Sequence, residues 1–195
     1  MIRRVAFLLL LCAGSTIVFP ENAAPADAAE LNHVMQLDRA TLLGFQASVH
    51  DAVKQGKATQ KQYECIRQFQ PSVFTEIYVR GINQTLSPEE IRVAVAFYRS
   101  PTGSKSILLG FAELKHRIGT SAPLSEISAA FTAADDKAIE AIPELNETDN
   151  KAVQTFSETS AGKKLLLEHA LQSAPITAQI KDKIVSLLPT CAPQK

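Results

Sequence analysis

Residues Leu86 to Leu109 read LSPEEIRVAVAFYRSPTGSKSILL and carry the densest set of local structural signals in the chain. Ser87 precedes Pro88 and stands three residues before Glu90, which is the spacing of a capping box with proline in the first helical turn. In such a box the serine hydroxyl accepts a hydrogen bond from the glutamate amide, and the glutamate carboxylate accepts one from the serine amide. The sequence therefore predicts that a helix begins at Pro88.

The residues behind this cap predict one helix, a sharp corner and a second helix. Apolar side chains recur at helical spacing, with one more aromatic beside them: Ile91, Ala94, Val95, Tyr98 and Phe97. Proline at 101 disfavours helical backbone at Ser100, so the first helix is expected to end at Arg99 and Ser100 to cap a second helix that begins at Pro101. Gly103 has no side chain and would let the preceding helix approach closely, with Phe97 expected to press against it.

The same pattern returns 59 residues further along the chain. At that offset, without gaps, the aligned pairs are Leu86 with Leu145, Ser87 with Asn146, Phe97 with Phe156, Ser100 with Thr159, Gly103 with Gly162, Lys105 with Lys164 and Leu108 with Leu167. Few aligned positions are identical, but the matching ones cap a helix or allow a close approach. We therefore expect two copies of a helix–corner–helix unit. The alternative is that amphipathic helices with polar caps resemble one another in any case.

These residues also resemble the core motif of a secreted bacterial family, domain-of-unknown-function family 2059. The resemblance lies in Leu-Ser-x-Glu-Glu at 86–90, the apolar stretch that follows, and FYRSPTGSK at 97–105. It implies an all-helical protein of the cell envelope. It implies no activity and no catalytic residues, because none is established for the family.

Residues 1–28 are predicted to be a cleaved secretory signal. Arg3 and Arg4 form a basic start, a mostly apolar run follows at 5–18, and small residues at 26–28 precede a cut, so the mature chain should begin near Ala29. The apolar run is too short to span a bilayer comfortably, and we expect no transmembrane segment after cleavage. Cys12 raises the alternative of a lipid anchor, but a leucine precedes it where a small residue is required.

The remaining residues, 29–195, are enough for a single domain with a sizeable core. Residues 1–28 contain two basic and two acidic side chains, so the mature chain keeps the net charge of zero of the whole sequence. Binding to nucleic acid requires a concentrated basic face. We therefore do not expect a nucleic-acid partner.

Hydrophobic periodicity predicts an all-α bundle of about seven to eight helices that includes the two similar corner units. Besides those units, the pattern favours a long helix from Leu31 to Gln55, one capped by Thr59, one after Pro71, one from Leu124 to Ile142, and a last helix between Pro175 and Pro189. Neither the alternation of a strand nor a hairpin turn signal occurs.

Two cysteines follow the signal, Cys65 and Cys191. An even number in an oxidising compartment favours a disulfide, which would attach the C-terminal tail to the second helical segment. The alternative is two buried free thiols.

No catalytic or metal-binding pattern stands out, and we expect no cofactor. The histidines His33, His50, His116 and His169 are scattered, without a partner at metal-ligand spacing. One local group of residues could bind a ligand. The free backbone amides of a helix that begins at Ser100 would lie near Arg99 and Lys105, and together they could hold a small anion or a partner's carboxylate. We favour the alternative, in which Arg99 caps the outgoing helix and Lys105 is solvated.

Together these features predict an exported helical protein that is not an enzyme and that serves as a binding or structural module of the cell envelope, with a protein partner. Two other functions stay open. One is an envelope hydrolase or transferase, which a pocket of converging polar groups with perturbed pKa values would favour. The other is an immunity-type antagonist of a periplasmic toxin.

Overall fold

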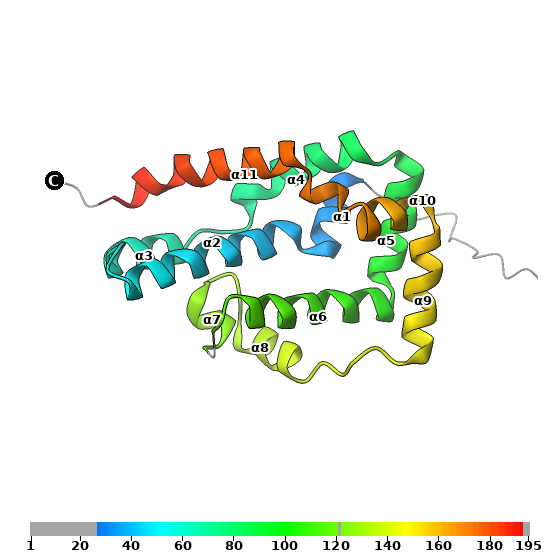
Figure 1. The fold of residues 1–195 in the computed structure, drawn as a ribbon, viewed down its shortest axis with the longest axis horizontal. Coiled ribbons are helices and arrows are strands. Elements are labelled where there is room, and N and C mark those ends of the chain that lie inside the picture. The colour runs from blue at the N-terminus through cyan, green and yellow to red at the C-terminus, as the bar shows by residue number, and fades with distance from the viewer. Residues whose placement is uncertain (1–26, 121, 193–195) are drawn as a thin grey trace, which may run out of the picture.

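The computed structural model describes residues 27–120 and 122–192, and these residues form eleven α-helices and no strand (Figure 1). The helices are α1 (Ala28–Met35), α2 (Leu37–Lys54), α3 (Gln60–Arg67), α4 (Ser72–Thr85), α5 (Pro88–Arg99), α6 (Pro101–Arg117), α7 (Leu124–Ile127), α8 (Ala133–Glu140), α9 (Glu147–Glu158), α10 (Ser160–Gly162) and α11 (Ala174–Leu187). A π-helical segment, Lys163–Leu167, follows α10, and 3-10 segments, Ala170–Gln172 and Leu188–Cys191, flank α11. The all-α prediction is confirmed. The predicted signal lies outside the described residues except for its last two positions.

The expected count of seven to eight helices is wrong, and one reason is a break in the helix predicted over residues 31–55. Gln36 has a left-handed backbone (φ 53°) and separates α1 from α2. In the first turn of α2, Asp38 accepts hydrogen bonds from Asn32 Nδ2 of α1 (2.8 Å) and Thr75 Oγ1 of α4 (2.5 Å). This cluster, in which Asn32 and Asp38 are buried, fixes the bend and directs α1 across α4 and α5.

The helix predicted over 124–142 is likewise two helices, α7 and α8. Thr132 begins α8 with a capping box, because its hydroxyl accepts from the Asp135 amide and the Asp135 carboxylate accepts from the Thr132 amide. One residue further, Asp136 accepts from the amide of Leu124 (2.6 Å) and so caps the start of α7. Arg39 of α2 forms an ion pair with Asp135 (2.7 Å). These contacts fold α8 back onto α7.

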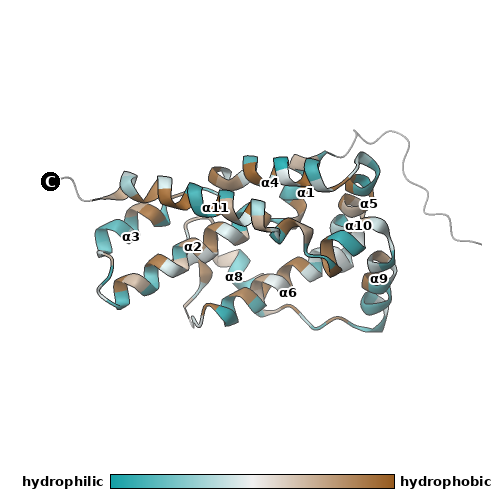
Figure 2. Cartoon of the chain, turned by 45° about the horizontal axis from the view of Figure 1, so that its top comes forward, coloured by the Kyte–Doolittle hydropathy of each residue, from teal (hydrophilic) through white to brown (hydrophobic). Residues whose placement is uncertain are grey.

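α2 is the central helix, and its neighbours pack on two sides. Leu42 faces a large apolar cluster shared with α1, α3, α4, α5 and α11, whereas Leu43 faces a smaller one shared with α6, α7 and α8. Both leucines are fully buried. Figure 2 shows hydrophobic residues along α2 where it lies between α11 and α6. None of the described helices has the length and apolar character needed to cross a membrane.

A disulfide joins Cys65 of α3 to Cys191 in the 3-10 segment after α11, with Cα atoms 5.7 Å apart. This confirms the predicted pairing and excludes two free thiols. The other end of α11 is fixed by Ile176, which is buried against Gly81 of α4. A Cβ built on Gly81 would lie only 2.7 Å from the Cδ1 atom of Ile176. α11 is therefore held at both ends.

Candidate functional site

The first corner joins α5 to α6 at Ser100, as the sequence predicts. Ser100 Oγ accepts a hydrogen bond from the Gly103 amide (3.1 Å). The capping box at the start of α5 is present, with the Ser87 amide 2.7 Å from Glu90 Oε2. One detail differs, because Gly103 meets the backbone of Phe97 and not its ring: a Cβ at Gly103 would lie 2.1 Å from the Phe97 carbonyl oxygen. The carbonyl of the outgoing helix therefore requires glycine here.

The second corner repeats this geometry, but the unit around it is not a full copy of the first. Thr159 Oγ1 accepts from the Gly162 amide (2.9 Å), and a Cβ at Gly162 would lie 1.9 Å from the Phe156 carbonyl oxygen. After Gly162 the chain continues as a π-helical segment, whereas α6 continues as a long α-helix. The two units share a cap and a corner and differ in their second helix.

Ion pairs join the two corners in a reciprocal way. Lys105 of α6 pairs with Asp149 in the first turn of α9 (Nζ to Oδ2, 2.7 Å). Lys164, after α10, pairs with Glu90 in the first turn of α5 (2.8 Å). Both the two lysines and the two carboxylates are separated by 59 residues. The lysine of each unit therefore binds the capping carboxylate of the other unit. The sequence alignment had shown only that the two lysines occupy equivalent positions.

These contacts lower the pKa values of both carboxyl groups to about 2. For Glu90 the largest cause is the hydrogen bond from Lys164, followed by that from the Ser160 hydroxyl (2.5 Å). For Asp149 the largest cause is the hydrogen bond from Lys105. Both carboxylates are therefore charged at neutral pH, and their role is to hold the two units together.

Aromatic rings fill the space between the corners. Phe97 and Phe156, which are equivalent at the 59-residue offset, stack face to face with centroids 4.0 Å apart and planes 5° apart. Tyr98 meets both rings edge-on, at 5.1 and 5.7 Å. Burial raises the pKa of Tyr98 to about 12, so its hydroxyl stays protonated. The ring of Phe97 is half-buried in this stack.

The three residues considered as an anion or partner site each have a partner within the protein. Arg99 pairs with Glu30 of α1, Ser100 caps α6, and Lys105 pairs with Asp149. Lys105 is not solvated as expected, since its side chain is 15% exposed. Only Arg99, at 61%, is largely exposed. The corner is thus chiefly a structural contact.

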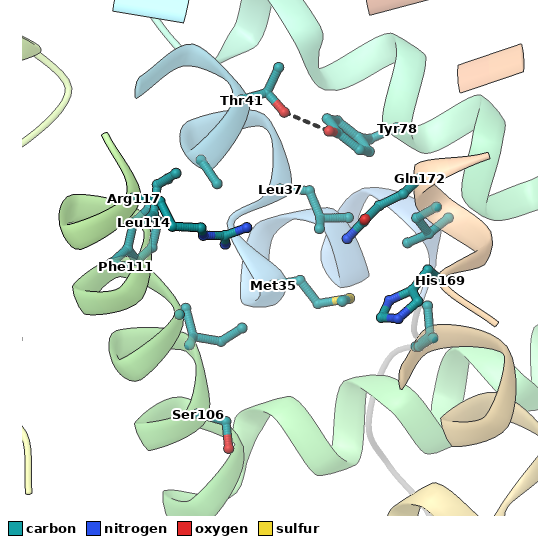
Figure 3. A pocket seen from close by; sticks show the side chains of 15 residues that line it. Met35, Leu37, Thr41, Tyr78, Ser106, Phe111, Leu114, Arg117, His169 and Gln172 are labelled. Carbon is teal, nitrogen blue, oxygen red and sulfur yellow. Dashed lines mark hydrogen bonds between the residues drawn. The ribbon is translucent and has the colours of Figure 1, made fainter. Parts of the chain in front are cut away.

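An open cleft lies in a different part of the molecule. This cleft of about 450 Å³ lies between the start of α2, residues 106–117 of α6 and residues 165–172 (Figure 3). Its apolar lining includes Met35, Leu37, Ile107, Phe111, Leu165 and Leu171, and its polar lining includes Thr41, Tyr78, Ser106, Arg117, His169 and Gln172. These residues come from distant segments and share no motif. For that reason no sequence pattern indicated a site here.

Helical glycines line this cleft and a second groove. Gly110 of α6 lines the cleft, and Gly44 of α2 lines a groove of about 640 Å³ between α2 and α11. A Cβ built on either glycine would meet nothing within 4 Å. The other described glycines within helices are explained by close packing: Gly81, Gly103 and Gly162. Gly44 and Gly110 instead face open space, and Gly110 is exposed to solvent.

One titratable group with a perturbed pKa lines the cleft. Burial raises the pKa of Tyr78, and the smaller effect of its hydrogen bond with Thr41 (2.5 Å) opposes this rise. Among residues 27–120 and 122–192, no group of three or more His, Cys, Asp or Glu is placed to hold a metal ion. Among the described residues that line the cleft, Arg117 has a formal positive charge, and none is Asp or Glu.

No protein-family model, curated protein or solved structure matches this chain. The resemblance to domain-of-unknown-function family 2059 stays a prediction that rests on residues 86–105.

Proposed function

We propose that this chain is an exported, non-catalytic binding protein of the bacterial cell envelope, and that the cleft beside α6 is its binding site. The observation that carries the proposal is Gly110, a mid-helix glycine that faces empty space in the wall of the cleft. The disulfide supports export, because such bonds persist mainly in oxidising compartments.

The argument from Gly110 is energetic. Glycine in a helix interior costs about 0.5 to 1 kcal/mol relative to alanine. Where a neighbouring backbone occupies the Cβ position, as at Gly103, this cost is unavoidable. Where the position is empty, a side chain would increase stability and fill the hollow. A glycine at such a place favours an occupant from outside the chain, and the same holds for Gly44 in the groove between α2 and α11, on whose side we place a protein partner.

The titratable groups favour binding over catalysis. An envelope hydrolase or transferase would need polar groups with perturbed pKa values converging on a pocket. The strongly shifted groups, Glu90, Asp149 and Tyr98, lie at the contact between the two corners and do not line the cleft. Tyr78 does line the cleft, but its pKa is raised, which keeps the hydroxyl protonated.

We place the protein partner expected from the sequence on the side of α11. Val185 and Leu188 are large apolar residues that are 66% and 42% exposed. Leu188 also lines the groove between α2 and α11, next to Ile184. Exposed apolar residues beside a groove are typical of protein contact sites.

The test is a titration of the disulfide-bonded protein with the fluorescent dye 1-anilinonaphthalene-8-sulfonate. Gly110→Leu would place a side chain in the cleft, and Gly44→Leu, the matched control, would place one in the other groove. We expect saturable dye binding to the wild type and to Gly44→Leu, and loss of binding in Gly110→Leu, although both variants are at least as stable in urea. Equal dye binding in all three proteins would contradict the proposal.

Export has a separate test. Terminal sequencing of the protein isolated from the envelope should find a mature chain that begins near Ala29. An intact Met1 would contradict export.

A further inference from the structure

We propose that the ligand of this cleft is a carboxylate carried on an apolar body, and that Arg117 binds the carboxylate. This inference rests on the proposed function, because it names the ligand class of the same cleft.

The apolar lining sets the body of the ligand. Phe111, Leu165 and Leu171 are buried side chains with an edge in the cleft, and Leu37 lies near its centre in Figure 3. The volume of about 450 Å³ is within the range of small-molecule sites, which are mostly apolar with a few polar groups. Each buried methylene group of such a ligand should tighten binding about threefold to fourfold.

The charge of the cleft sets the head group. Arg117 is the one formally charged side chain among the described residues that line it, and no Asp or Glu lines it. Figure 3 shows its guanidinium turned into the cleft, across from the amide of Gln172 and the ring of His169. An apolar cation would meet repulsion without a compensating carboxylate, whereas an anion gains the charged guanidinium and hydrogen-bond donors from Gln172 and His169.

The ion pair that Arg117 forms within the protein is weak. Glu113, one helical turn earlier, lies 3.5 Å from its Nε, and the two side chains are 60% and 68% exposed. An exposed pair of this kind contributes little, so a ligand can replace it at small cost. The planar guanidinium also matches a carboxylate with two parallel hydrogen bonds. A single guanidinium balances one negative charge, which favours a carboxylate over a doubly charged phosphate.

The test is calorimetric titration of the full disulfide-bonded chain with four probes. Decanoate and 2-naphthoate carry a carboxylate on a chain or on a ring, decan-1-ol is neutral, and decylammonium is cationic. We expect at least one carboxylate to bind ten or more times more tightly than decan-1-ol, and decylammonium to bind most weakly. Arg117→Gln should reduce carboxylate affinity about tenfold and leave decan-1-ol unchanged. The matched control Arg92→Gln, at another exposed arginine paired one turn away, should change neither.

Each result separates this inference from the proposed function. Binding of decanoate alone or naphthoate alone supports it and distinguishes a chain from a ring. Equal affinity for decanoate and decan-1-ol, with both blocked by Gly110→Leu, overturns the carboxylate and leaves the binding function standing. If no probe binds and Gly110→Leu leaves the dye fluorescence unchanged, both the carboxylate ligand and the proposed binding function of the cleft are wrong.

Discussion

The two glycines of α6 give opposite responses to the same substitution. Gly103 and Gly110 lie seven residues apart in one helix, so alanine changes their intrinsic helix propensity in the same direction. They differ in what a Cβ would meet, which is backbone at Gly103 and open space at Gly110. Gly103→Ala should therefore destabilise the protein, whereas Gly110→Ala should stabilise it.

The magnitude follows from the distances at the corner. A Cβ at Gly103 would lie 2.1 Å from the Phe97 carbonyl oxygen and 2.6 Å from the Tyr98 Cα. Both atoms belong to the backbone of α5 and cannot rotate aside, so α5 and α6 would have to separate. Overpacking of this kind costs typically about 1 to 3 kcal/mol, at times more. Gly110→Ala should add about 0.5 to 1 kcal/mol, because it meets no atom. We expect the two variants to differ by about 3 kcal/mol.

Urea unfolding measures this difference. With a slope of about 2 kcal/mol/M, the midpoints should differ by about 1.5 M, with the wild type between them. Gly162→Ala, at the second corner, should behave as Gly103→Ala does, because its Cβ would lie 1.9 Å from a carbonyl oxygen. If Gly103→Ala and Gly110→Ala unfold at the same urea midpoint, the claim that the α5 backbone occupies the Cβ position of Gly103 is wrong.

Three further predictions concern the contacts between the units and the C-terminal helix. In a double-mutant cycle, Phe97→Ala and Phe156→Ala should show a coupling of about 0.5 to 1.5 kcal/mol, and strict additivity would contradict the ring stack. The pKa values of Glu90 and Asp149 fall from ordinary values of 4.5 and 3.8 to about 2 on folding. Their stabilisation should be complete above about pH 5 and be lost as the pH falls toward 2, so Glu90→Gln with Asp149→Asn should flatten the acid limb of stability against pH. Reduction of the disulfide, which joins residues 126 apart, should lower the free energy of unfolding by up to about 5 kcal/mol and expose α11 to proteolysis; an unchanged melting temperature would count against this role.

The parts of the fold that the sequence predicted are those with local causes. The capping box of Ser87 and Glu90 and the corner at Ser100 depend on residues three positions apart, so spacing alone reveals them. The break at Gln36 was missed because it depends on a distant partner, whereas the break at Thr132 has a local cap that spacing alone could have revealed, since Asp135 stands three residues further on. At the first, Asp38 is held by Thr75, which is 37 residues away.

The cleft could not be predicted for the same reason. Arg117, His169 and Leu37 belong to three segments that meet only in the folded chain, and none stands in a recognisable motif. The sequence indicated only one side of the reciprocal ion pairs, because the offset of 59 residues aligns Lys105 with Lys164. The alignment could not show that each lysine binds the carboxylate of the opposite unit, because the direction of packing is a property of the fold.

The most direct test of the binding proposal is to locate an added ligand by NMR. Amide shifts of the uniformly ¹⁵N-labelled, disulfide-bonded protein would be followed during titration with decanoate, and again with 1-anilinonaphthalene-8-sulfonate. We expect the largest saturable shifts at residues lining the cleft, among them Leu37, Gly110 and Leu171, and none of comparable size at Gly44 or Ile184 in the other groove. Shifts confined to the groove between α2 and α11, or no saturable shift with either probe, would contradict the assignment of the cleft as the binding site.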